Sequence, residues 1–290
     1  MHADPAPPPD LVAARPSGRA GASPAAPSAD TPAALRARIR AGRHRTHTAG
    51  LAPGFLQANL AIVPSAAAPD FLLYCHRNPK PCPLIGVSDP GNPRLPALGQ
   101  DLDLRTDVPA YRVFRDGAPG ELVDDLRDVW RDDLVAFALG CSFSFEDALG
   151  LAGIPVRHVA AGRNVPMYRT NVRTRAAGPF AGPLVVTLRA FRPADAIRAI
   201  VLSERFPLAH GAPVHLGDPA AIGVDDLARP DFGDPPVIEP GDALVYWACG
   251  VTPQLALGAA GLDLVVAHEP GHMLVTDVPA ASAESALAGP

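Results

Sequence analysis

Short strand-like and helix-like segments alternate along most of this chain of 290 residues, and this alternation is the feature that most limits its fold. Apolar and β-branched runs typical of strands occupy residues 58–63, 84–87, 165–172, 184–188, 214–216, 244–247, 262–267 and 273–275, with a hairpin at 111–114 and 121–123. Helical signals occupy residues 31–40, 69–76, 134–139, the segment from 144, 194–206 and 253–260. The pattern predicts an α/β fold with helices on both faces of a sheet.

Composition divides the chain into a tail and one large domain. Residues 1–30 are rich in proline and alanine and cannot bury enough apolar surface to offset chain ordering, so we expect a disordered tail there. We expect residues 31–290 to form the α/β domain. Residues from about 85 to 190 contain few helical signals between their strands, which predicts a smaller inserted α+β unit.

The overall balance of residues excludes several classes of function. The net charge is −5 with both signs interspersed, so the sequence offers no basic surface for nucleic acid. It contains neither an apolar run long enough to span a membrane nor an export signal, which predicts a cytoplasmic protein. The four cysteines are scattered, and we expect most of them to be reduced and partly buried rather than paired in a disulfide framework.

The segment His268-Glu269-Pro270-Gly271-His272 matches the H-E-x-x-H pattern of zinc peptidases letter for letter. That pattern binds zinc only on a helix, where both imidazoles share one face. Pro270 and Gly271 oppose a helix, and the preceding residues are β-branched and apolar. We therefore expect a strand, a Pro-Gly turn and a second strand, with His268 and His272 as weak candidates for metal ligands.

Two segments predict strand-to-helix junctions that could bind an anion. In the first, Gly250 lets the backbone turn, Thr252 precedes a proline suited to a helix start, and Gln254 follows within the first turn. In the second, Cys141 and Ser142 lie just before a helix. Free backbone N–H groups at a helix start stabilise carboxylates or phosphates, although an ordinary capped connection would have the same sequence pattern.

Further polar candidates lie on a strand and in a loop. Around 165–172 the alternation places Arg169 and Asn171 on one side of a strand and Tyr168 and Thr170 on the other. Arginine matches a carboxylate with a planar fork, so Arg169 with Asn171 is a candidate substrate clamp, unless Arg169 is simply exposed at the surface. Thr48 lies in a Gly/Pro loop rich in hydroxyl and imidazole groups.

Seven sequence blocks together resemble the provisionally named hydro-lyase family that is related to D-glutamate cyclase. They are residues 47–60 (HTAGLAPGFLQANL from His47), 77–83 (RNPKPCP), 130–146 (WRDDLVAFALGCSFSFE), 162–171 (GRNVPMYRTN), 210–223 (HGAPVHLGDPAAIG), 247–254 (WACGVTPQ) and 270–277 (PGHMLVTD). The resemblance covers about residues 35–278 and implies a three-layer α/β sandwich with a mixed sheet and a smaller two-layer unit. Most members have no known substrate, while vertebrate relatives convert D-glutamate to 5-oxo-D-proline and water.

The resemblance implies a hydro-lyase that acts on a small carboxylic or amino acid without a cofactor, as a monomer or a homo-oligomer. We hypothesise that Arg169 and Asn171 bind the α-carboxylate and that Thr48 adds a further contact. Ser142 and the helix start from Gly250 through Thr252 to Gln254 would stabilise the oxyanion, and His272 with Asp277 would move protons. Cys141 is a weaker catalytic candidate.

Two alternatives stay open from the sequence. One is a small-carboxylate binding protein that performs no chemistry, and the other is a metal-dependent dehydratase with His268, His272 and Asp277 as ligands. All these hypotheses require the segments near residues 142, 169, 252 and 272 to converge on one cleft.

Overall fold

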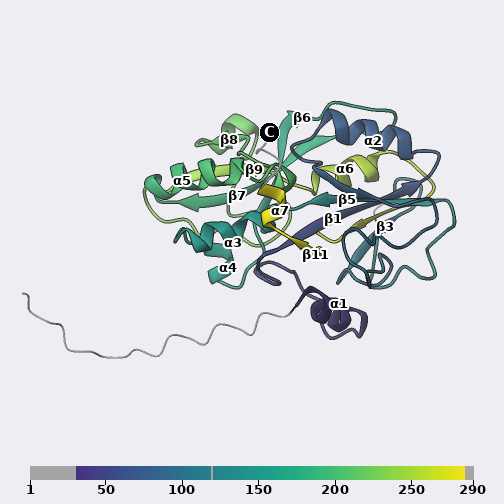
Figure 1. The fold of residues 1–290 in the computed structure, drawn as a ribbon. Helices are drawn as coiled ribbons and strands as arrows, with labels where there is room; N and C mark the ends of the chain where they lie inside the picture. The colour runs from purple at the N-terminus through teal and green to yellow at the C-terminus, as the bar shows by residue number, and fades with distance from the viewer. Residues whose placement is uncertain (1–30, 119, 285–290) are drawn as a thin grey trace, which may run out of the picture.

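The computed structural model describes residues 31–118 and 120–284, which build two β-sheets lying side by side along the molecule (Figure 1). The α/β class predicted from the alternation is confirmed. The tail expected at residues 1–30 lies outside the described part of the chain.

The larger sheet has the strand order β2-β5-β1-β10-β3-β4, and β11 also pairs with β1. Its strands are β1 (Phe55–Pro64), β2 (Leu84–Val87), β3 (Tyr111–Phe114), β4 (Glu121–Val123), β5 (Leu134–Gly140), β10 (Val265–His268) and β11 (Leu274–Pro279). The smaller sheet has the order β6-β7-β9-β8, formed by β6 (Met167–Arg173), β7 (Pro183–Phe191), β9 (Ala243–Ala248) and β8 (His215–Leu216).

All strand pairs in the described residues are antiparallel, so the expectation of a mixed sheet is wrong. Parallel neighbours require a crossover connection that returns to the same sheet. Here α3 (Phe143–Leu151) leads from β5 in the larger sheet toward β6 in the smaller, and α6 (Thr252–Ala259) leads from β9 back to β10. The strands between 85 and 190 are divided between the two sheets. The inserted unit predicted at about 85–190 therefore does not correspond to either sheet.

Strands β1 and β5 are buried on both faces of the larger sheet. Successive residues of β5 point alternately into two apolar clusters, Leu134, Ala136 and Ala138 into one and Val135, Phe137 and Leu139 into the other. We predicted a helix at 134–139 from its alanine and leucine content, and that prediction is wrong. Packing on two faces outweighs intrinsic helix propensity, which is a weak preference.

Different segments cover the two faces of the larger sheet. Helices α2 (Ala68–Arg77) and α6 pack on one face. On the other face, where the alternation predicted helices, the irregular segment 88–110 contributes leucines and Val108 instead. Helix α1 (Pro32–Arg40) packs against β11, and it starts at the predicted point, where Thr31 Oγ1 accepts from Ala34 N at 3.3 Å.

One face of the smaller sheet packs on α3 and on α5 (Pro193–Glu204), with Trp247 of β9 fully buried between them. The short helix η2 (Pro219–Ile222) lies over the other face.

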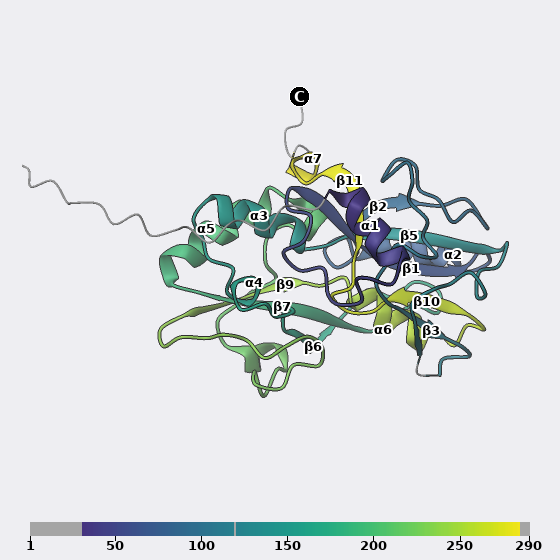
Figure 2. The same ribbon diagram turned by 90° about the horizontal axis from the view of Figure 1, so that it is seen from below.

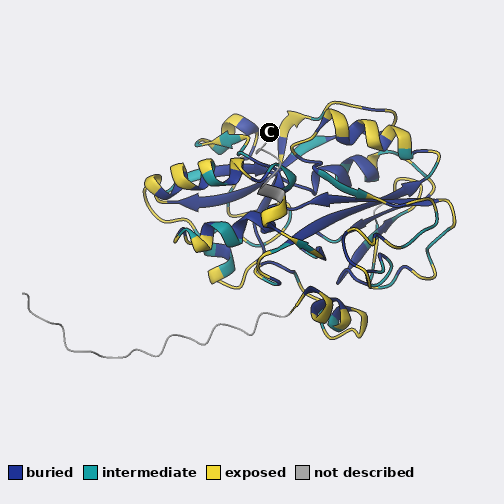
Figure 3. Ribbon diagram, viewed as in Figure 1, coloured by how far each residue is buried: buried dark blue, intermediate teal, exposed yellow. Residues whose placement is uncertain are grey.

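Three further short helices complete the described chain, α4 (Arg157–Ala160), η1 (Pro207–Ala209) and α7 (Ala281–Glu284). Turning the molecule shows the two sheets from below (Figure 2), and burial follows the strands while the outer faces of α2 and α5 are exposed (Figure 3). Among the described residues, no helix has the length and apolar character needed to cross a membrane.

Candidate active site

The two predicted strand-to-helix junctions meet at the seam between the sheets. Strand β5 of the larger sheet leads through Cys141 and Ser142 into α3, and β9 of the smaller sheet leads through Cys249 and Gly250 into α6. Residues of both junctions line one central cavity. Because the starts of two helices face this cavity, the positive ends of both helix dipoles favour a negatively charged group there.

The central cavity has a volume of about 20 Å³, which is room for about one water molecule. Thirteen residues line it: Asn59, Cys141, Ser142, Phe143, Val165, Met167, Thr187, His210, Cys249, Gly250, Val251, Gly271 and Met273. All of them except Thr187 fall within the seven sequence blocks quoted above. The required convergence therefore occurs for all four segments, near 142, 169, 252 and 272, although the second contributes Val165 and Met167 rather than Arg169.

The His268-to-His272 segment reaches the cavity because it interrupts a strand. Strand β10 pairs with β1 at Ala61 and Ile62, and β11 pairs with the same edge of β1 farther along, at Gln57 and Ala58. The predicted strand, turn and strand are thus confirmed, with Gly271 at a φ of 84° in the turn. The turn bulges out opposite the middle of β1 and brings Gly271 and Met273 to the cavity.

Asn59 of β1 holds the two junctions together. Its Nδ2 donates to Gly140 O at 2.8 Å and to Leu139 O at 3.3 Å, at the end of β5. A Cβ on Gly250 would lie 2.1 Å from the Asn59 amide, so only glycine allows the β9–α6 junction to approach this side chain so closely. The Asn59 side chain is buried and faces the cavity.

A buried polar network lies directly behind Ser142. Arg189 Nη2 donates to Ser142 Oγ and Arg189 Nη1 donates to Thr187 Oγ1, each at 3.0 Å. The same guanidinium pairs with the Glu146 carboxylate through Nη2 and through Nε, at 3.0 Å for Nε. His158 Nε2 lies 3.1 Å from Glu146 Oε1. Because Ser142 Oγ accepts from Arg189, the hydroxyl hydrogen of Ser142 is free to donate elsewhere.

Charge pairing keeps Glu146 ionised inside the protein. Burial opposes the charge of this carboxyl group, but electrostatic attraction to His158 and Arg189 outweighs burial and lowers the Glu146 pKa to about 2. The Arg189 guanidinium also stacks over two rings, 5.1 Å from the centroid of Phe145 and 5.4 Å from that of Trp247. The network is therefore a fixed arrangement of charges beside the cavity.

His210 lines the cavity and is held by one backbone contact. Its Nδ1 lies 2.6 Å from the carbonyl oxygen of Lys80, and because a carbonyl only accepts, Nδ1 carries the ring hydrogen. Burial lowers the pKa of His210 to about 4, so the ring is neutral near pH 7 and Nε2 is unprotonated. The residue has a φ of 76°, a strained conformation for a residue with a side chain.

The two cavity cysteines are unsuited to nucleophilic attack. Burial raises the pKa of Cys141 to about 12 and that of Cys249 to about 11, so both remain thiols at neutral pH. All four cysteines of the chain are free, in line with the sequence, and they are buried more completely than the partial burial expected.

Several predicted substrate contacts are occupied by structural hydrogen bonds. Thr48 Oγ1 donates to Gln57 Oε1 at 2.7 Å and accepts from Met273 N at 3.1 Å, which ties its loop to the turn after β10. Thr252 Oγ1 accepts from Val185 N at 2.9 Å. Gln254 Nε2 donates to the carbonyl of His268 at 2.7 Å. Of the β9–α6 junction, Gly250 lines the cavity while Thr252 and Gln254 do not.

Arg169 and Asn171 lie at the surface, so the structure does not bring the predicted clamp to the cavity. The alternation itself is confirmed, with Tyr168 and Thr170 buried and the other two exposed. Arg169 Nε lies 3.6 Å from Asp231 Oδ1, and the guanidinium stacks 5.3 Å from the centroid of the Phe232 ring. The misplacement arises because the inward face of β6 carries the apolar residues that pack on the sheet.

The expected proton-moving pair does not form. Asp277 pairs with Arg36 of α1 at 2.9 Å, and no hydrogen bond or ion pair in the described chain joins it to His272. His272 lies next to the cavity residues Gly271 and Met273, but its own side chain is not part of the lining. Its Nδ1 lies 3.2 Å from Pro270 O.

The metal-ligand alternative finds little support in the side-chain geometry. His268 is fully buried, and Leu60 N donates to its Nδ1 at 3.1 Å. Burial lowers its pKa to about 4. Over residues 31–118 and 120–284, no group of three or more His, Cys, Asp or Glu side chains is arranged to hold a metal ion.

Sequence reasoning missed Glu146, His158, Arg189 and His210. Each had one available signal: a charged or imidazole group within or beside an apolar segment, as in the β7 sequence Pro183–Phe191 around Arg189. A buried charge requires a partner. Glu146 and Arg189 pair with each other but lie 43 residues apart along the chain, and only the fold brings them together.

Comparison with known proteins points to one family. A sequence profile described as D-glutamate cyclase matches residues 135–277. A provisionally named hydro-lyase of Bordetella petrii is 60% identical over 247 residues, which cover 84% of this chain and 94% of the relative. A similarly named protein of Dinoroseobacter shibae is 58% identical over 247 residues, covering 85% of this chain and 82% of the relative.

A solved structure gives no further guidance. A nitrogen repressor-like protein from Methanococcus jannaschii aligns with 84% of this chain and 97% of its own, at 9% identity and a TM-score of 0.36. A similarity at this level does not establish a shared fold.

Proposed function

Because the chain belongs to the D-glutamate cyclase family, we propose that it removes water from a small amino or carboxylic acid at the central cavity. The reaction we favour is the cyclisation of D-glutamate to 5-oxo-D-proline, after the description of the family profile.

One observation supports the central cavity as the site of the reaction. Twelve of its thirteen lining residues come from the sequence blocks that also carry the family resemblance, and they arrive from both sheets. The two helix starts at the cavity add positive potential. These features suit the carboxylate of an acidic substrate.

The chemistry needs proton transfer but no net proton. When the amine of glutamate attacks its γ-carboxyl carbon, a C–N bond forms and a C–O bond breaks. Two hydrogens leave the ammonium nitrogen, and both end on the departing oxygen as water. The attack is intramolecular, which removes much of the entropic cost without prior activation of the acid.

We assign the transfer of protons to His210. Its neutral ring offers Nε2 as the acceptor, and the Lys80 carbonyl fixes the tautomer. His210 replaces His272 in this role because His210 lines the cavity and His272 does not.

Ser142 is positioned to stabilise the tetrahedral oxyanion. Arg189 donates to Ser142 Oγ, which polarises the hydroxyl and leaves its hydrogen free for the developing negative charge. Arg189 acts through Ser142 and is held by Glu146, so both are positioning residues.

The cavity must widen before a substrate binds, since it has room for about one water molecule. Met167 and Met273 line it and have unbranched, flexible side chains that adapt to different shapes. We therefore expect substrate binding to be coupled to a local rearrangement of these side chains.

The test is to incubate the protein with D-glutamate, L-glutamate and related hydroxy acids and to measure ring formation or water loss. His210→Asn is the informative variant because asparagine tolerates the left-handed backbone at this position. We expect turnover to fall about a hundredfold or more with little change in substrate affinity. His76→Asn, on the exposed side of α2, is the matched control and should retain full turnover.

Two outcomes would contradict the proposal. Binding of D-glutamate that raises the melting temperature without product would favour a carboxylate-binding protein. Equal turnover by the wild type and His210→Asn, together with loss in His272→Asn, would return the proton-transfer role to His272.

A further inference from the structure

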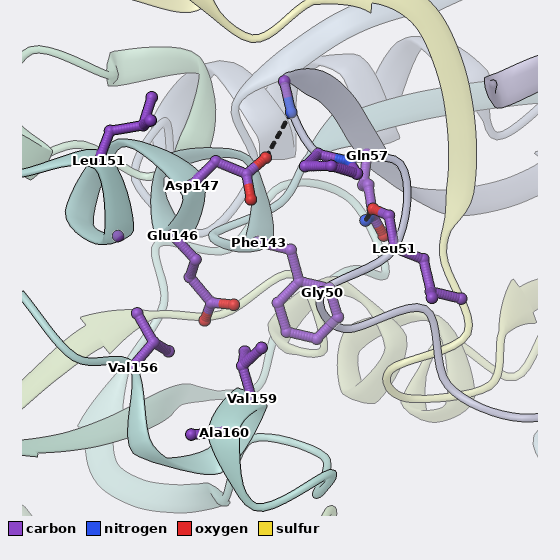
Figure 4. Close-up of a pocket in the computed structure, with 13 residues that line it drawn as sticks. Gly50, Leu51, Gln57, Phe143, Glu146, Asp147, Leu151, Val156, Val159 and Ala160 are labelled. Atoms are coloured by element: carbon purple, nitrogen blue, oxygen red, sulfur yellow. Dashed lines mark hydrogen bonds between the residues drawn. The ribbon is translucent and has the colours of Figure 1, made fainter. Parts of the chain in front are cut away.

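A second, larger pocket lies beside the central cavity and is not needed for the proposed reaction. Its volume is about 620 Å³, within the range of small-molecule sites. The loop 50–54, Gln57 of β1, α3 and α4 form its walls (Figure 4). We call it the outer pocket, and Phe143 is the one residue that lines both it and the central cavity.

The walls of the outer pocket are mostly apolar. Leu51, Phe143, Leu151, Val156 and Val159 supply aliphatic and aromatic surface. Leu151 at the end of α3 is 91% exposed, which is unusual for a leucine and leaves apolar surface at the edge of the pocket. Such a surface suits a ligand with an apolar body.

One polar group in the outer pocket lacks a partner. Glu146 is only 5% exposed, and its Oε1 is engaged by Arg189 and lies beside His158. Its Oε2 is buried and has no hydrogen-bond partner among the described residues. Figure 4 shows this carboxylate between Phe143, Val156 and Val159. A buried carboxylate oxygen without a partner is costly, which indicates that a donor belongs there.

The charges that line the outer pocket have one sign. Its ionisable residues are Glu146 and Asp147, and no Lys, Arg or His side chain lines it. Asp147 accepts a hydrogen bond from Gly54 N at the rim. Arg189 already pairs with Glu146 from outside this lining. An acidic molecule such as glutamate would still meet carboxylate oxygens and no cationic side chain in the lining, whereas an ammonium group would find an acceptor.

We propose that the outer pocket binds an apolar molecule that carries one ammonium group, with the ammonium donating to Glu146 Oε2 and the apolar body lying against Leu51, Val156 and Val159. This ligand is chemically distinct from the acidic substrate and uses a separate site. An ammonium supplies the missing donor and offsets the negative lining in one contact.

The ligand class can be tested with three probes of one carbon skeleton: phenylbutylamine, phenylbutanol and phenylbutanoate. Calorimetric titration of the whole protein at pH 7 should give tenfold or more tighter binding of the amine than of the alcohol, and the weakest binding for the acid. Equal binding of amine and alcohol would overturn the ammonium contact. Tightest binding of the acid would overturn the proposal and make the outer pocket a route for the acidic substrate.

Two variants locate the binding site. Val159→Phe adds bulk inside the outer pocket and should weaken amine binding at least tenfold, while Val201→Phe adds the same bulk to a residue of α5 that is 62% exposed and should have no effect. Glu146→Gln should remove the preference for amine over alcohol. If Glu146→Gln does not fold, the probe series on the wild type and on Val159→Phe still decides the question, and unchanged amine binding in Val159→Phe would place the ligand elsewhere. None of these measurements depends on turnover of glutamate.

Discussion

Glu146→Gln provides a quantitative test of the buried charge network. The folded protein lowers the Glu146 pKa from the ordinary value of 4.5 to about 2. At about 1.36 kcal/mol for each pKa unit, this difference corresponds to roughly 3 kcal/mol of folding stability when the carboxylate is ionised. Because Glu146 is fully buried, solvent screening does not reduce this figure greatly.

The sign of the pH dependence follows from the direction of the shift. A carboxyl whose folded pKa is depressed stabilises the protein above its unfolded pKa, and this contribution is lost as the pH falls toward the folded value. The stability gap between the wild type and Glu146→Gln should therefore be constant from pH 7 to about pH 5. It should then shrink by about 3 kcal/mol as the pH falls from about 4.5 toward 2.

Urea unfolding at a series of pH values, followed by tryptophan fluorescence, measures this gap. Trp247 is fully buried against the network, so its emission reports loss of the local packing. Other carboxylates titrate equally in both proteins and cancel in the difference. Glu121→Gln on the exposed strand β4 is the control. A gap that stays constant between pH 5 and pH 3, or widens there, would refute a buried and ionised Glu146.

Three further predictions concern glycine, cysteine and Asp277. A Cβ on Gly140 would lie 1.6 Å from Leu208 O, so Gly140→Ala should lower stability by several kcal/mol, whereas Gly150→Ala in α3 meets nothing within 4 Å and should raise it by about 0.5–1 kcal/mol in thermal unfolding. Cys141 and Cys249, with pKa values raised to about 12 and about 11, should react with iodoacetamide at pH 8 only in unfolded protein, and rapid labelling of the native state would contradict their burial. Asp277→Asn weakens the pair with Arg36 and should lower the melting temperature by a few degrees with turnover per folded molecule unchanged, and a selective loss of turnover would restore its catalytic role.

Local sequence signals were sufficient for the junctions and the turn. Glycine, proline and capping residues located the starts of α1, α3 and α6 to within about two residues, because these preferences act over one helical turn. The Pro270-Gly271 pair likewise excluded the zinc helix, and the structure has a turn there between two strands. Both junctions were candidates for an anion site on sequence grounds, and residues of both line the central cavity.

Strand direction and the positions of the buried charged residues depend on long-range packing, which local sequence patterns do not predict. The strands pair antiparallel because α3 and α6 connect one sheet to the other instead of returning to the same sheet. No local sequence pattern predicts this connection. Arg169 and Arg189 are both strand arginines, yet only Arg189 faces the site, because its partners Glu146 and Ser142 belong to a distant helix start. His210 was missed since its role depends on one contact to Lys80, 130 residues away.

We propose that an acidic substrate loses water at the cavity where β5–α3 and β9–α6 meet, with His210 moving the protons. D-Glutamate whose γ-carboxylate carries a heavy oxygen isotope on both oxygens provides a direct test of this reaction. Mass spectrometry of the product from the wild type should find 5-oxo-D-proline that retains one labelled oxygen, and product should be nearly absent with His210→Asn. No labelled product from the wild type, or an equal yield from His210→Asn, would contradict the account.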